Sequence, residues 1–246
     1  VSVSDVEGSS EGVSRVSFGD LNGDGSPELL VGWSQYNTRN QKLALYFLND
    51  TLEEQASDEI YTHMLVNEFT GSGRDELMLF NVTAADAPTA VKLLSYEDGR
   101  LAVRDTAELD AGIQRFGTSK TVALSETVNG VFIDCYKDAN TTITELLFWN
   151  AEADGGQGEL ETPFYRAEDK LTTLTARESS IPLMDIDGDG MVGWPVSSRL
   201  PGYETVNAAD AMWKTTWMTW DYATRQSRQA FSCVMNERDG YYVLFD

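Results

Sequence analysis

The stretch FGDLNGDGSPELLVGW, from Phe18 to Trp33, decides the expected fold. It carries oxygen donors at alternate positions and a carboxylate just before an apolar run; these candidate ligands are Asp20, Asn22, Asp24, Ser26 and Glu28. A calcium ion takes about six to eight oxygen ligands, which a tight loop of Asp and Asn can supply. Gly23 and Gly25 provide the positive φ angles that such a loop needs. The stretch therefore predicts a calcium-binding loop.

Two kinds of calcium loop begin in this way, and the later positions distinguish them. The helix-flanked loop needs a bidentate Glu at its twelfth position, but counting from Asp20 that position is Val31. A hairpin loop closes at the ninth position, which is Glu28, and Ser26 would offer its backbone carbonyl. Asp, Asn and Gly also form turns without any metal. Here the crowded acids have no Lys or Arg nearby to offset their repulsion, which favours a bound cation between two strands.

The loop recurs along the chain. The segment NEFTGSGRDELML, from Asn67, repeats the pattern 48 residues after Gly19 and keeps both glycines and the closing Glu76. Its ligands are replaced by Thr70, Ser72 and Arg74, so this copy is expected to keep its turn without metal. A weaker copy is expected around 124–134, with a turn at Asn129-Gly130.

A further copy, MDIDGDGMVGWPV, begins at Met184. It places Asp185, Asp187 and Asp189 at ligand positions, and Met191 could add its carbonyl. The ninth position is Gly193 instead of Glu, so calcium at this loop would lack one ligand.

Between the loops the chain reads as short strands with turns and without helical periodicity. The expected strands are 13–18, 28–33, 42–48, 90–96, 101–104, 131–136, 144–149, 215–221, 229–235 and 241–245, and 151–170 is expected to be a loop. A repeat of about 50 residues with about four antiparallel strands is typical of a β-propeller. The sequence predicts an all-β fold, a single β-propeller or propeller fragment with about four to five blades. The approximate blades are 13–60, 61–112, 113–178 and 179–246, and 1–12 would be a strand of a preceding blade.

Composition limits the possible partners. The 246 residues include 40 acidic and 18 basic side chains, giving a net charge of −22. That charge argues against nucleic acid and anionic membranes, which bind through Lys and Arg. No apolar run approaches the ~20 residues of a spanning helix, so no membrane insertion by this chain is expected. Cys135 and Cys233 form no metal-binding pattern and would be either a disulfide or two buried thiols.

The order of the motifs resembles a known family. The loop DLNGDGSPELLVG is similar to the FG-GAP or VCBS repeat of integrin α-chain heads and bacterial surface proteins. GRDELMLF, DIDGDG, LPGYE, WKTTWMTWDY and DGYYVLF follow in the order found in uncharacterised VCBS-repeat lipoproteins of gut Clostridia. The resemblance implies an exported, lipid-anchored, cell-surface propeller without known chemistry, whose anchor and first blade would precede Val1.

These observations favour a non-catalytic, calcium-binding recognition or adhesion module, a monomer with a protein or glycan ligand. His63 is the single histidine, and it is expected to pack at a strand edge instead of serving in catalysis. One alternative is a carbohydrate-active enzyme or glycan-binding domain that uses carboxylates and a platform of Trp213, Trp217 and Trp220. Such tryptophans also commonly fill the space between blades. A purely structural scaffold domain is the second alternative.

Overall fold

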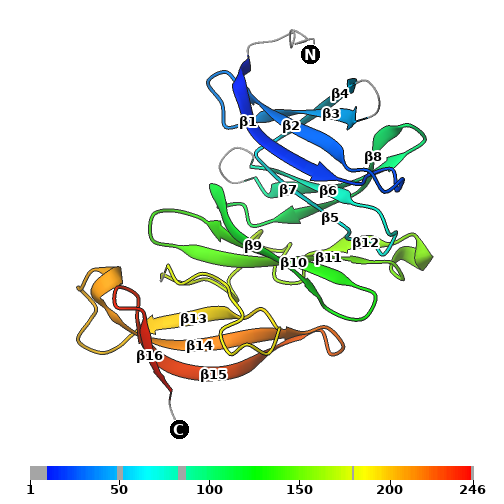
Figure 1. Ribbon diagram of the computed structural model, residues 1–246. Helices are drawn as coiled ribbons and strands as arrows, with labels where there is room; N and C mark the ends of the chain where they lie inside the picture. Colours follow the sequence, from blue (N-terminus) through cyan, green and yellow to red (C-terminus); the bar gives the residue numbers. More distant parts are fainter. Residues whose placement is uncertain (1–9, 49–51, 83–86, 179, 245–246) are drawn as a thin grey trace. The chain divides into compact units, whose positions relative to one another are not determined.

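The computed structural model describes residues 10–48, 52–82, 87–178 and 180–244. These residues form strands β1 to β16 and two short 3-10 helices, η1 (Asp154–Gly156) and η2 (Ala208–Asp210). The strands make four-stranded antiparallel sheets, and within each sheet they follow chain order from one edge to the other (Figure 1). The predicted all-β class is therefore confirmed. No helix in the described ranges is long and apolar enough to cross a membrane.

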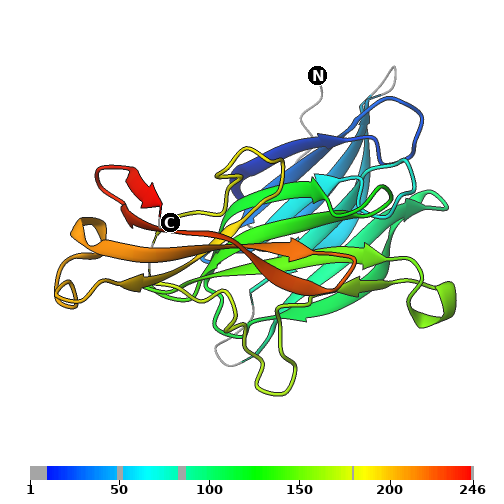
Figure 2. The same cartoon turned by 90° about the horizontal axis from the view of Figure 1, so that it is seen from below.

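Each sheet is a run of four consecutive strands. Sheet 1 contains β1 (Ser10–Gly19), β2 (Glu28–Gln35), β3 (Gln41–Leu48) and β4 (Leu52–Tyr61). Sheet 2 contains β5 (His63–Asn67), β6 (Glu76–Asn81), β7 (Thr89–Glu97) and β8 (Arg100–Leu109). Sheet 3 contains β9 (Arg115–Ala123), β10 (Asn129–Tyr136), β11 (Thr142–Asn150) and β12 (Glu159–Glu161). Sheet 4 contains β13 (Trp194–Arg199), β14 (Met212–Asp221), β15 (Gln226–Asn236) and β16 (Tyr241–Leu244), and Figure 2 shows the twist of β14 and β15, in orange and red.

The chain divides into two compact units. Unit 1 comprises Val1–Thr83 and Ala90–Ala107, and unit 2 comprises Ala84–Thr89 and Glu108–Asp246. In unit 1, sheets 1 and 2 pack face to face through a core that includes Leu30, Leu45, Leu77 and Leu79, all at most 2% exposed. In unit 2, sheets 3 and 4 pack through an aromatic core, in which the rings of Phe164 and Trp194 have centroids 4.8 Å apart.

Strands that are apolar at successive positions are buried on both faces. Leu77 to Phe80 in β6 and Ile143 to Trp149 in β11 are all buried, as their sequences ELMLFN and TITELLFWN predict. The expected strands 13–18 through 229–235 all lie within observed strands. The last expected strand, 241–245, matches β16 except at Phe245, which lies outside the described residues. Residues 1–9 of the strand expected at 1–12 lie outside them as well. The loop expected at 151–170 contains η1 and the short strand β12.

Two predicted turns have different outcomes. Asp98 and Gly99 have φ of 50° and 80° and join β7 to β8, as a type I′ hairpin requires. The turn predicted at Asn129-Gly130 is wrong, because both residues belong to β10. The turn precedes them, where the Leu124 amide donates to the Val128 carbonyl at 2.8 Å. Gly130 instead makes room for packing, since a Cβ there would lie 2.5 Å from Leu124 Cδ1.

The outer edge of sheet 3 is covered by two separate segments. Strand β12 pairs with β11 only along Phe148 to Asn150. Further along β11, Thr142 and Arg177 exchange two backbone hydrogen bonds of 2.9 Å. At Thr144 the partner is a side chain instead of a backbone: the Thr175 hydroxyl accepts from the Thr144 amide at 2.9 Å and donates to the Thr144 carbonyl at 2.7 Å. Residues 172–177 therefore complete the edge that the short β12 leaves open.

Candidate functional site

The first acidic loop lies between β1 and β2, as predicted, and it is organised around Asp20. One oxygen of Asp20 accepts from the amides of Gly23 and Asp24, and the other accepts from the Gly25 amide at 2.9 Å. Gly23 and Gly25 have φ of 76° and 85°, the conformation that glycine adopts without strain. Asp24 accepts from the Ser26 amide at 2.8 Å. The fold of the loop is therefore fixed by backbone amides that donate to its own carboxylates.

Glu28 closes this loop from the start of β2. Its side chain is buried, and its Oε2 accepts from the Leu21 amide at 2.8 Å. The Asn22 side-chain nitrogen donates to Glu28 Oε1 at 3.2 Å. Burial raises the pKa of Glu28, and the charges of Asp24 and Asp20 add to this effect. A cation at the loop would oppose that repulsion, so the donor set fits an oxygen-seeking divalent ion.

The second loop satisfies its closing carboxylate with hydroxyl groups. Glu76 Oε1 accepts from Thr70 Oγ1 at 2.5 Å and from Ser72 Oγ at 2.7 Å, while Oε2 accepts from the Phe69 amide at 2.7 Å. Glu68 takes the place of Asp20 and accepts from the amides of Gly71 and Ser72. In both copies the closing carboxylate accepts from protein groups, but two hydroxyl groups bind Glu76 where the Asn22 side-chain amide binds Glu28.

The fourth acidic loop precedes β13 and gathers three exposed carboxylates. One oxygen from each of Asp185, Asp187 and Asp189 lies within 4.8 Å of the others, a spacing that could hold a metal ion. Asp185 accepts from the amides of Gly188 and Gly190 at 2.8 and 3.0 Å, as Asp20 does in the first loop. Met191 is exposed, and its amide donates to Asp189.

The missing ninth ligand of this loop has a packing explanation. Gly193 exchanges two backbone hydrogen bonds with Met184, at 2.9 and 3.0 Å. A Cβ at Gly193 would lie 3.3 Å from Trp217 Cε3 and 3.3 Å from the Met218 carbonyl oxygen. The aromatic core of sheet 4 therefore leaves little room for a carboxylate where the first loop has Glu28.

The proposed tryptophan platform is wrong. Trp213, Trp217 and Trp220 are 1%, 0% and 7% exposed, because they lie on strand faces that pack into the interior of unit 2. Trp217 stacks with Phe231, and Trp220 meets Phe164 edge to face at 5.4 Å. Because almost none of their surface is exposed, these three rings form no open platform for stacking a sugar, and they stabilise the fold.

His63 and the two cysteines are also parts of the fold. His63 lies on the edge strand β5, as predicted, and its ring meets Phe80 edge to face at 5.7 Å. Burial lowers the pKa of His63 to about 4. Cys135 and Cys233 are free, buried thiols, which decides between the two alternatives in favour of unpaired cysteines.

A pocket of about 430 Å³ opens beside β13 in unit 2. Its lining residues come from the loop after β10, the edge segment of sheet 3, β13 and β14; they are Thr141, Ala176, Arg177, Glu178, Ser197, Ser198, Arg199 and Trp213. Pockets for small molecules usually have about 300–1,000 Å³. A pocket in unit 1, lined by Leu45, Gln55, Arg100 and neighbouring residues, is smaller, at about 240 Å³. The unit 2 pocket is therefore the stronger candidate for a ligand site.

Arg199, one of the lining residues, is held in place by several contacts. Its Nε donates to Glu178 at 3.2 Å, and its Nη1 donates to the carbonyl oxygens of Tyr203 and Val206. The guanidinium carbon lies 4.8 Å from the centre of the Trp213 ring. Within the described part of the chain, Nη2 makes no hydrogen bond, although the side chain is only 20% exposed. Arg199 therefore offers a positioned donor to a ligand oxygen.

The base of the pocket rests on a buried ion pair. Arg177 donates to Asp134 at 2.7 Å and to Thr144 Oγ1 at 2.9 Å, and its Nε donates to the Ile181 carbonyl. The other oxygen of Asp134 accepts from the Leu183 amide at 3.0 Å. This pair fixes the edge segment against β10 and β11. Because Arg177 and Asp134 are matched in charge, and Arg199 is matched by Glu178, the pocket is locally balanced in a strongly acidic chain.

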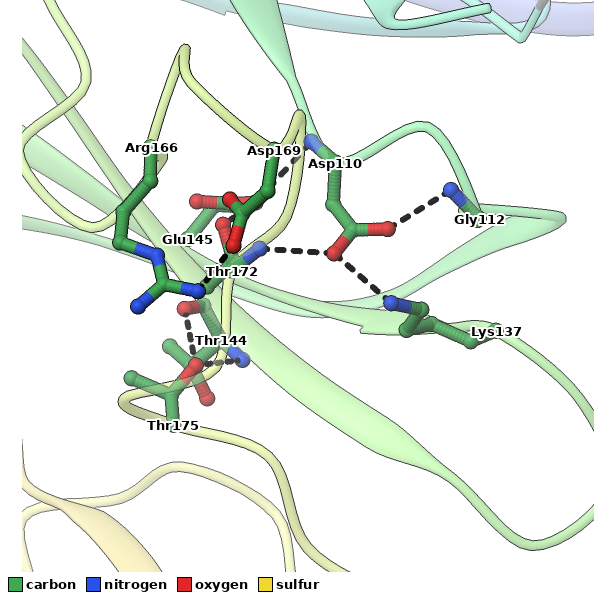
Figure 3. A network of polar contacts seen from close by, with 9 residues as sticks. All are labelled: Asp110, Gly112, Lys137, Thr144, Glu145, Arg166, Asp169, Thr172 and Thr175. Carbon is green, nitrogen blue, oxygen red and sulfur yellow. Dashed lines mark hydrogen bonds and ion pairs between the residues drawn. The ribbon is translucent and has the colours of Figure 1, made fainter. Parts of the chain in front are cut away.

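A second buried polar network lies around Glu145 (Figure 3). Thr172 joins two carboxyl groups: its hydroxyl donates to Glu145 Oε1 at 2.6 Å, and its amide donates to Asp110 Oδ2 at 2.7 Å. Lys137 pairs with Asp110 at 2.8 Å. Glu145 Oε2 has no partner among the described residues. Burial raises the pKa of Glu145 to about 8, and the Asp110 charge adds to the shift while the bond from Thr172 opposes it.

Arg177, Arg199 and Glu145 were not predicted as site residues from the sequence. Arg177 lies in an irregular segment, and its bond to Asp134 spans 43 positions. Arg199 is the last residue of β13, two positions before Pro201, and no motif surrounds it. Glu145 interrupts the apolar run TITELLFWN, and that interruption was the available signal, because a carboxylate on a fully buried strand needs a specific environment.

Comparison with known proteins gives a likeness in fold. No protein-family model matches the chain, and no curated protein does. Among solved structures, the chain is similar to the Bacillus licheniformis rhamnogalacturonan lyase PL11, with a TM-score of 0.51 and 13% identity over 94% of this chain. It is likewise similar to the exotype rhamnogalacturonan lyase YesX, with a TM-score of 0.52 and 13% identity over 94% of this chain. The chain spans about half the length of these proteins, 50% and 48% respectively.

This comparison corrects the function predicted from the sequence. The sequence predicted a non-catalytic recognition or adhesion module, but the two solved structures that the chain resembles in fold are rhamnogalacturonan lyases. The carbohydrate-active alternative agrees better with that finding. At 13% identity the likeness establishes the fold alone.

Proposed function

We propose that this chain is a domain of a carbohydrate-active protein and that it holds a sugar residue in the pocket beside Arg199. The observation that carries the proposal is that Arg199, whose Nη2 makes no hydrogen bond to the described residues, lines a pocket of about 430 Å³. The lining residues Thr141, Ser197 and Ser198 bring hydroxyl groups suited to a sugar. The shared fold of two rhamnogalacturonan lyases supports the same class of ligand.

The ligand we propose is an oligosaccharide that contains a uronate. A guanidinium group binds carboxylates strongly, because its hydrogen bonds are assisted by charge. Glu178 is the one carboxylate among the described lining residues, and it forms an ion pair with Arg199. A pocket with a single, paired carboxylate does not provide the two acids of a glycosidase. Cleavage, if the domain contributes to it, would be an elimination of the kind that lyases perform.

Binding by Arg199 can be tested directly. Titration of the protein with rhamnogalacturonan oligosaccharides in a calorimeter should show binding, and Arg199→Ala should weaken it by about 10- to 100-fold, the range for a hydrogen bond to a charged group. Arg228→Ala is the matched control, because Arg228 lies on β15 outside the pocket lining and pairs with Asp221. Ultraviolet absorbance would detect an unsaturated uronate product. Absence of binding in the unaltered protein, or equal losses in both variants, would refute the proposal.

We also propose that calcium binds at the two acidic loops. At the first loop the ligands would be Asp20, Asn22, Asp24, the Ser26 carbonyl and Glu28; at the fourth they would be Asp185, Asp187, Asp189 and the Met191 carbonyl. Two observations support this proposal: burial raises the pKa of Glu28, with the charges of Asp24 and Asp20 adding to the effect, and three carboxylates lie close together in the fourth loop. Since β13 begins just after the fourth loop and carries Ser197 to Arg199 at its other end, an ion there would help to fix the strand that lines the pocket.

Calcium should stabilise the protein by an amount that depends on these ligands. A calcium concentration about 100 times Kd would add about 2.7 kcal/mol to the free energy of unfolding, seen as a higher Tm after calcium is restored to chelator-treated protein. Asp24→Asn should remove the contribution of the first loop and Asp187→Asn that of the fourth. Glu68→Gln, at the first position of the hydroxyl-satisfied loop, should leave the calcium-dependent increment unchanged. A Tm that does not change when calcium is added would contradict the proposal.

We further propose that the four sheets are blades of a β-propeller of the FG-GAP or VCBS type, exported to a bacterial surface. The supporting observations are the four consecutive four-stranded antiparallel sheets and the acidic loop, which joins the first two strands of sheets 1 and 2 and recurs directly before β13 of sheet 4. An experimental structure in which the sheets are arranged around a common axis is the expected result, and two sheets packed as a closed sandwich would exclude it.

A further inference from the structure

The smaller pocket, in unit 1, is formed by strands of sheets 1 and 2. It has a volume of about 240 Å³, and all of its lining residues belong to the same compact unit. Two leucines line it together with five polar or charged residues, namely Gln55, Ser57, Asp58, Glu59 and Arg100. Pockets for drug-sized molecules usually have about 300–1,000 Å³. This pocket is therefore suited to one smaller molecule.

An irregularity in β4 coincides with the pocket. Ala44 of β3 pairs with Ala56 of β4, whereas Lys42 pairs with Ile60. Three residues of β4, 57–59, therefore lie opposite one residue of β3, which is a β-bulge. Bulges redirect side chains and are common at sheet edges and next to active sites. Since β4 is the last strand of sheet 1 and residues 57–59 all line the pocket, the bulge has both of these features.

Gln55 contributes a buried acceptor. Its Nε2 donates to the carbonyl oxygen of Gly99, in the hairpin that precedes β8. A carbonyl oxygen can only accept, so this bond fixes which end of the Gln55 amide is the nitrogen. The Oε1 atom is buried and accepts no hydrogen bond from the described residues. Because a buried acceptor without a partner is unfavourable, the site favours a ligand that donates a hydrogen bond.

Arg100 contributes donors of the opposite kind, and the charges around it limit the ligand. Arg100 is exposed and forms no hydrogen bond or ion pair with the residues that the structure describes. Glu59 pairs with Lys92 at 2.7 Å, and Asp58 lies 4.0 Å from Lys42. An anion in this pocket would lie near two carboxylates, and a cation would lie near the guanidinium group. A neutral ligand avoids both conflicts.

Hydroxyl groups match this combination, because each can donate one hydrogen bond and accept others. The Ser57 hydroxyl accepts from the Glu59 amide at 3.1 Å, and its own proton is bonded to no described residue. Leu45 and Leu101 complete the lining, and both belong to or pack against the core of unit 1. Small-molecule pockets commonly combine apolar surface with a few polar groups that fix orientation. A sugar ring suits both parts, since it has C–H groups beside its hydroxyl groups.

We propose that the pocket in unit 1 binds one neutral monosaccharide unit, whose hydroxyl groups donate to Gln55 Oε1 and accept from Arg100. This second sugar site uses none of the residues that line the pocket of Arg199 in unit 2. Both proposals concern sugars, but they rest on different residues and can fail separately. A single ring makes few contacts, so its affinity should be in the millimolar range.

Methyl NMR spectra recorded during titration with L-rhamnose and with D-galactose test this proposal. The methyl signals of Leu45 and Leu101 should shift as either sugar is added. Arg100→Ala should weaken this binding by about tenfold, the effect of losing a hydrogen bond to a charged group, and Gln55→Leu should weaken it as well. Arg104→Ala is the matched control, because Arg104 lies on the same strand outside the pocket lining.

Each possible result decides the question. Absence of shifts at Leu45 and Leu101 with both neutral sugars overturns the proposal. Equal binding by the unaltered protein and by Arg100→Ala also overturns it, and circular dichroism checks that the variants fold. Tighter binding of D-galacturonate at these two leucines would exclude a neutral ligand. The shifts should persist in Arg199→Ala, which separates this site from the pocket in unit 2.

Discussion

Asp134→Ala should lower the free energy of unfolding by about 3–5 kcal/mol, the cost of removing one partner from a buried ion pair. The side chains of Asp134 and Arg177 are 2% and 0% exposed, so water cannot replace the lost carboxylate. The same substitution removes the acceptor of the Leu183 amide. Since a whole domain is typically stable by about 5–15 kcal/mol, a loss of this size should be evident in urea denaturation.

A surface ion pair provides the control for this prediction. Asp210 Oδ1 and Arg238 Nη1 are 2.5 Å apart, but the two side chains are 37% and 63% exposed. Asp210→Ala should therefore cost at most about 1 kcal/mol, as exposed pairs usually do. If Asp134→Ala costs no more than Asp210→Ala, the buried pair does not have the role assigned to it. The result matters for function because Arg177 forms the base of the proposed sugar pocket.

Glu145→Gln should make the protein more stable at alkaline pH and leave it nearly unchanged at pH 5. The folded protein raises the pKa of Glu145 to about 8, above its ordinary value of 4.5. Between these values the folded state holds a proton that the unfolded state releases, so stability is lost as pH rises from about 4.5 to 8. The slope should approach about 1.4 kcal/mol per pH unit. Gln mimics the protonated acid, still accepts the hydrogen bond from Thr172 and cannot ionise.

The measurement is the difference in unfolding free energy between the two proteins over a pH series. Taking the difference cancels the other titrating groups that the proteins share, including Asp110 and Lys137, which face Glu145. The difference should grow in favour of the variant from about pH 5 to pH 8 and then level off. A difference that does not change with pH would show that Glu145 is already ionised in the folded protein.

The sequence predicted the strands well because their signals are local. β2 and β6 are short apolar runs preceded by Gly-rich turns, and the Asp98-Gly99 hairpin is specified by two adjacent residues. The turn residues of the acidic loops were also visible, because Asp20 bonds to amides within five positions. Patterns of this kind need no knowledge of how distant parts of the chain meet.

The candidate pocket could not be predicted, because it depends on contacts that are distant in sequence. Arg199 meets Glu178 across 21 positions, and Thr172 meets Asp110 across 62. The tryptophans of β14 illustrate a different limit: an aromatic side chain at alternate positions of a strand suits either a sugar platform or a core. Only distant parts of the chain, Phe132 and Phe148 of sheet 3 and Phe164 of the loop after β12, decide in favour of the core.

The hydroxyl of Thr175, which takes the place of a backbone partner beside β11, has a practical consequence. Because residues 172–177 already occupy the rim of sheet 3, a foreign strand cannot add there, and this rim should not seed aggregation. The exposed loop at 166–170 joins two segments that pair with β11, namely β12 before it and residues 172–177 after it. Foreign peptides inserted in this loop, such as affinity tags or reporter epitopes, should be tolerated without loss of folding.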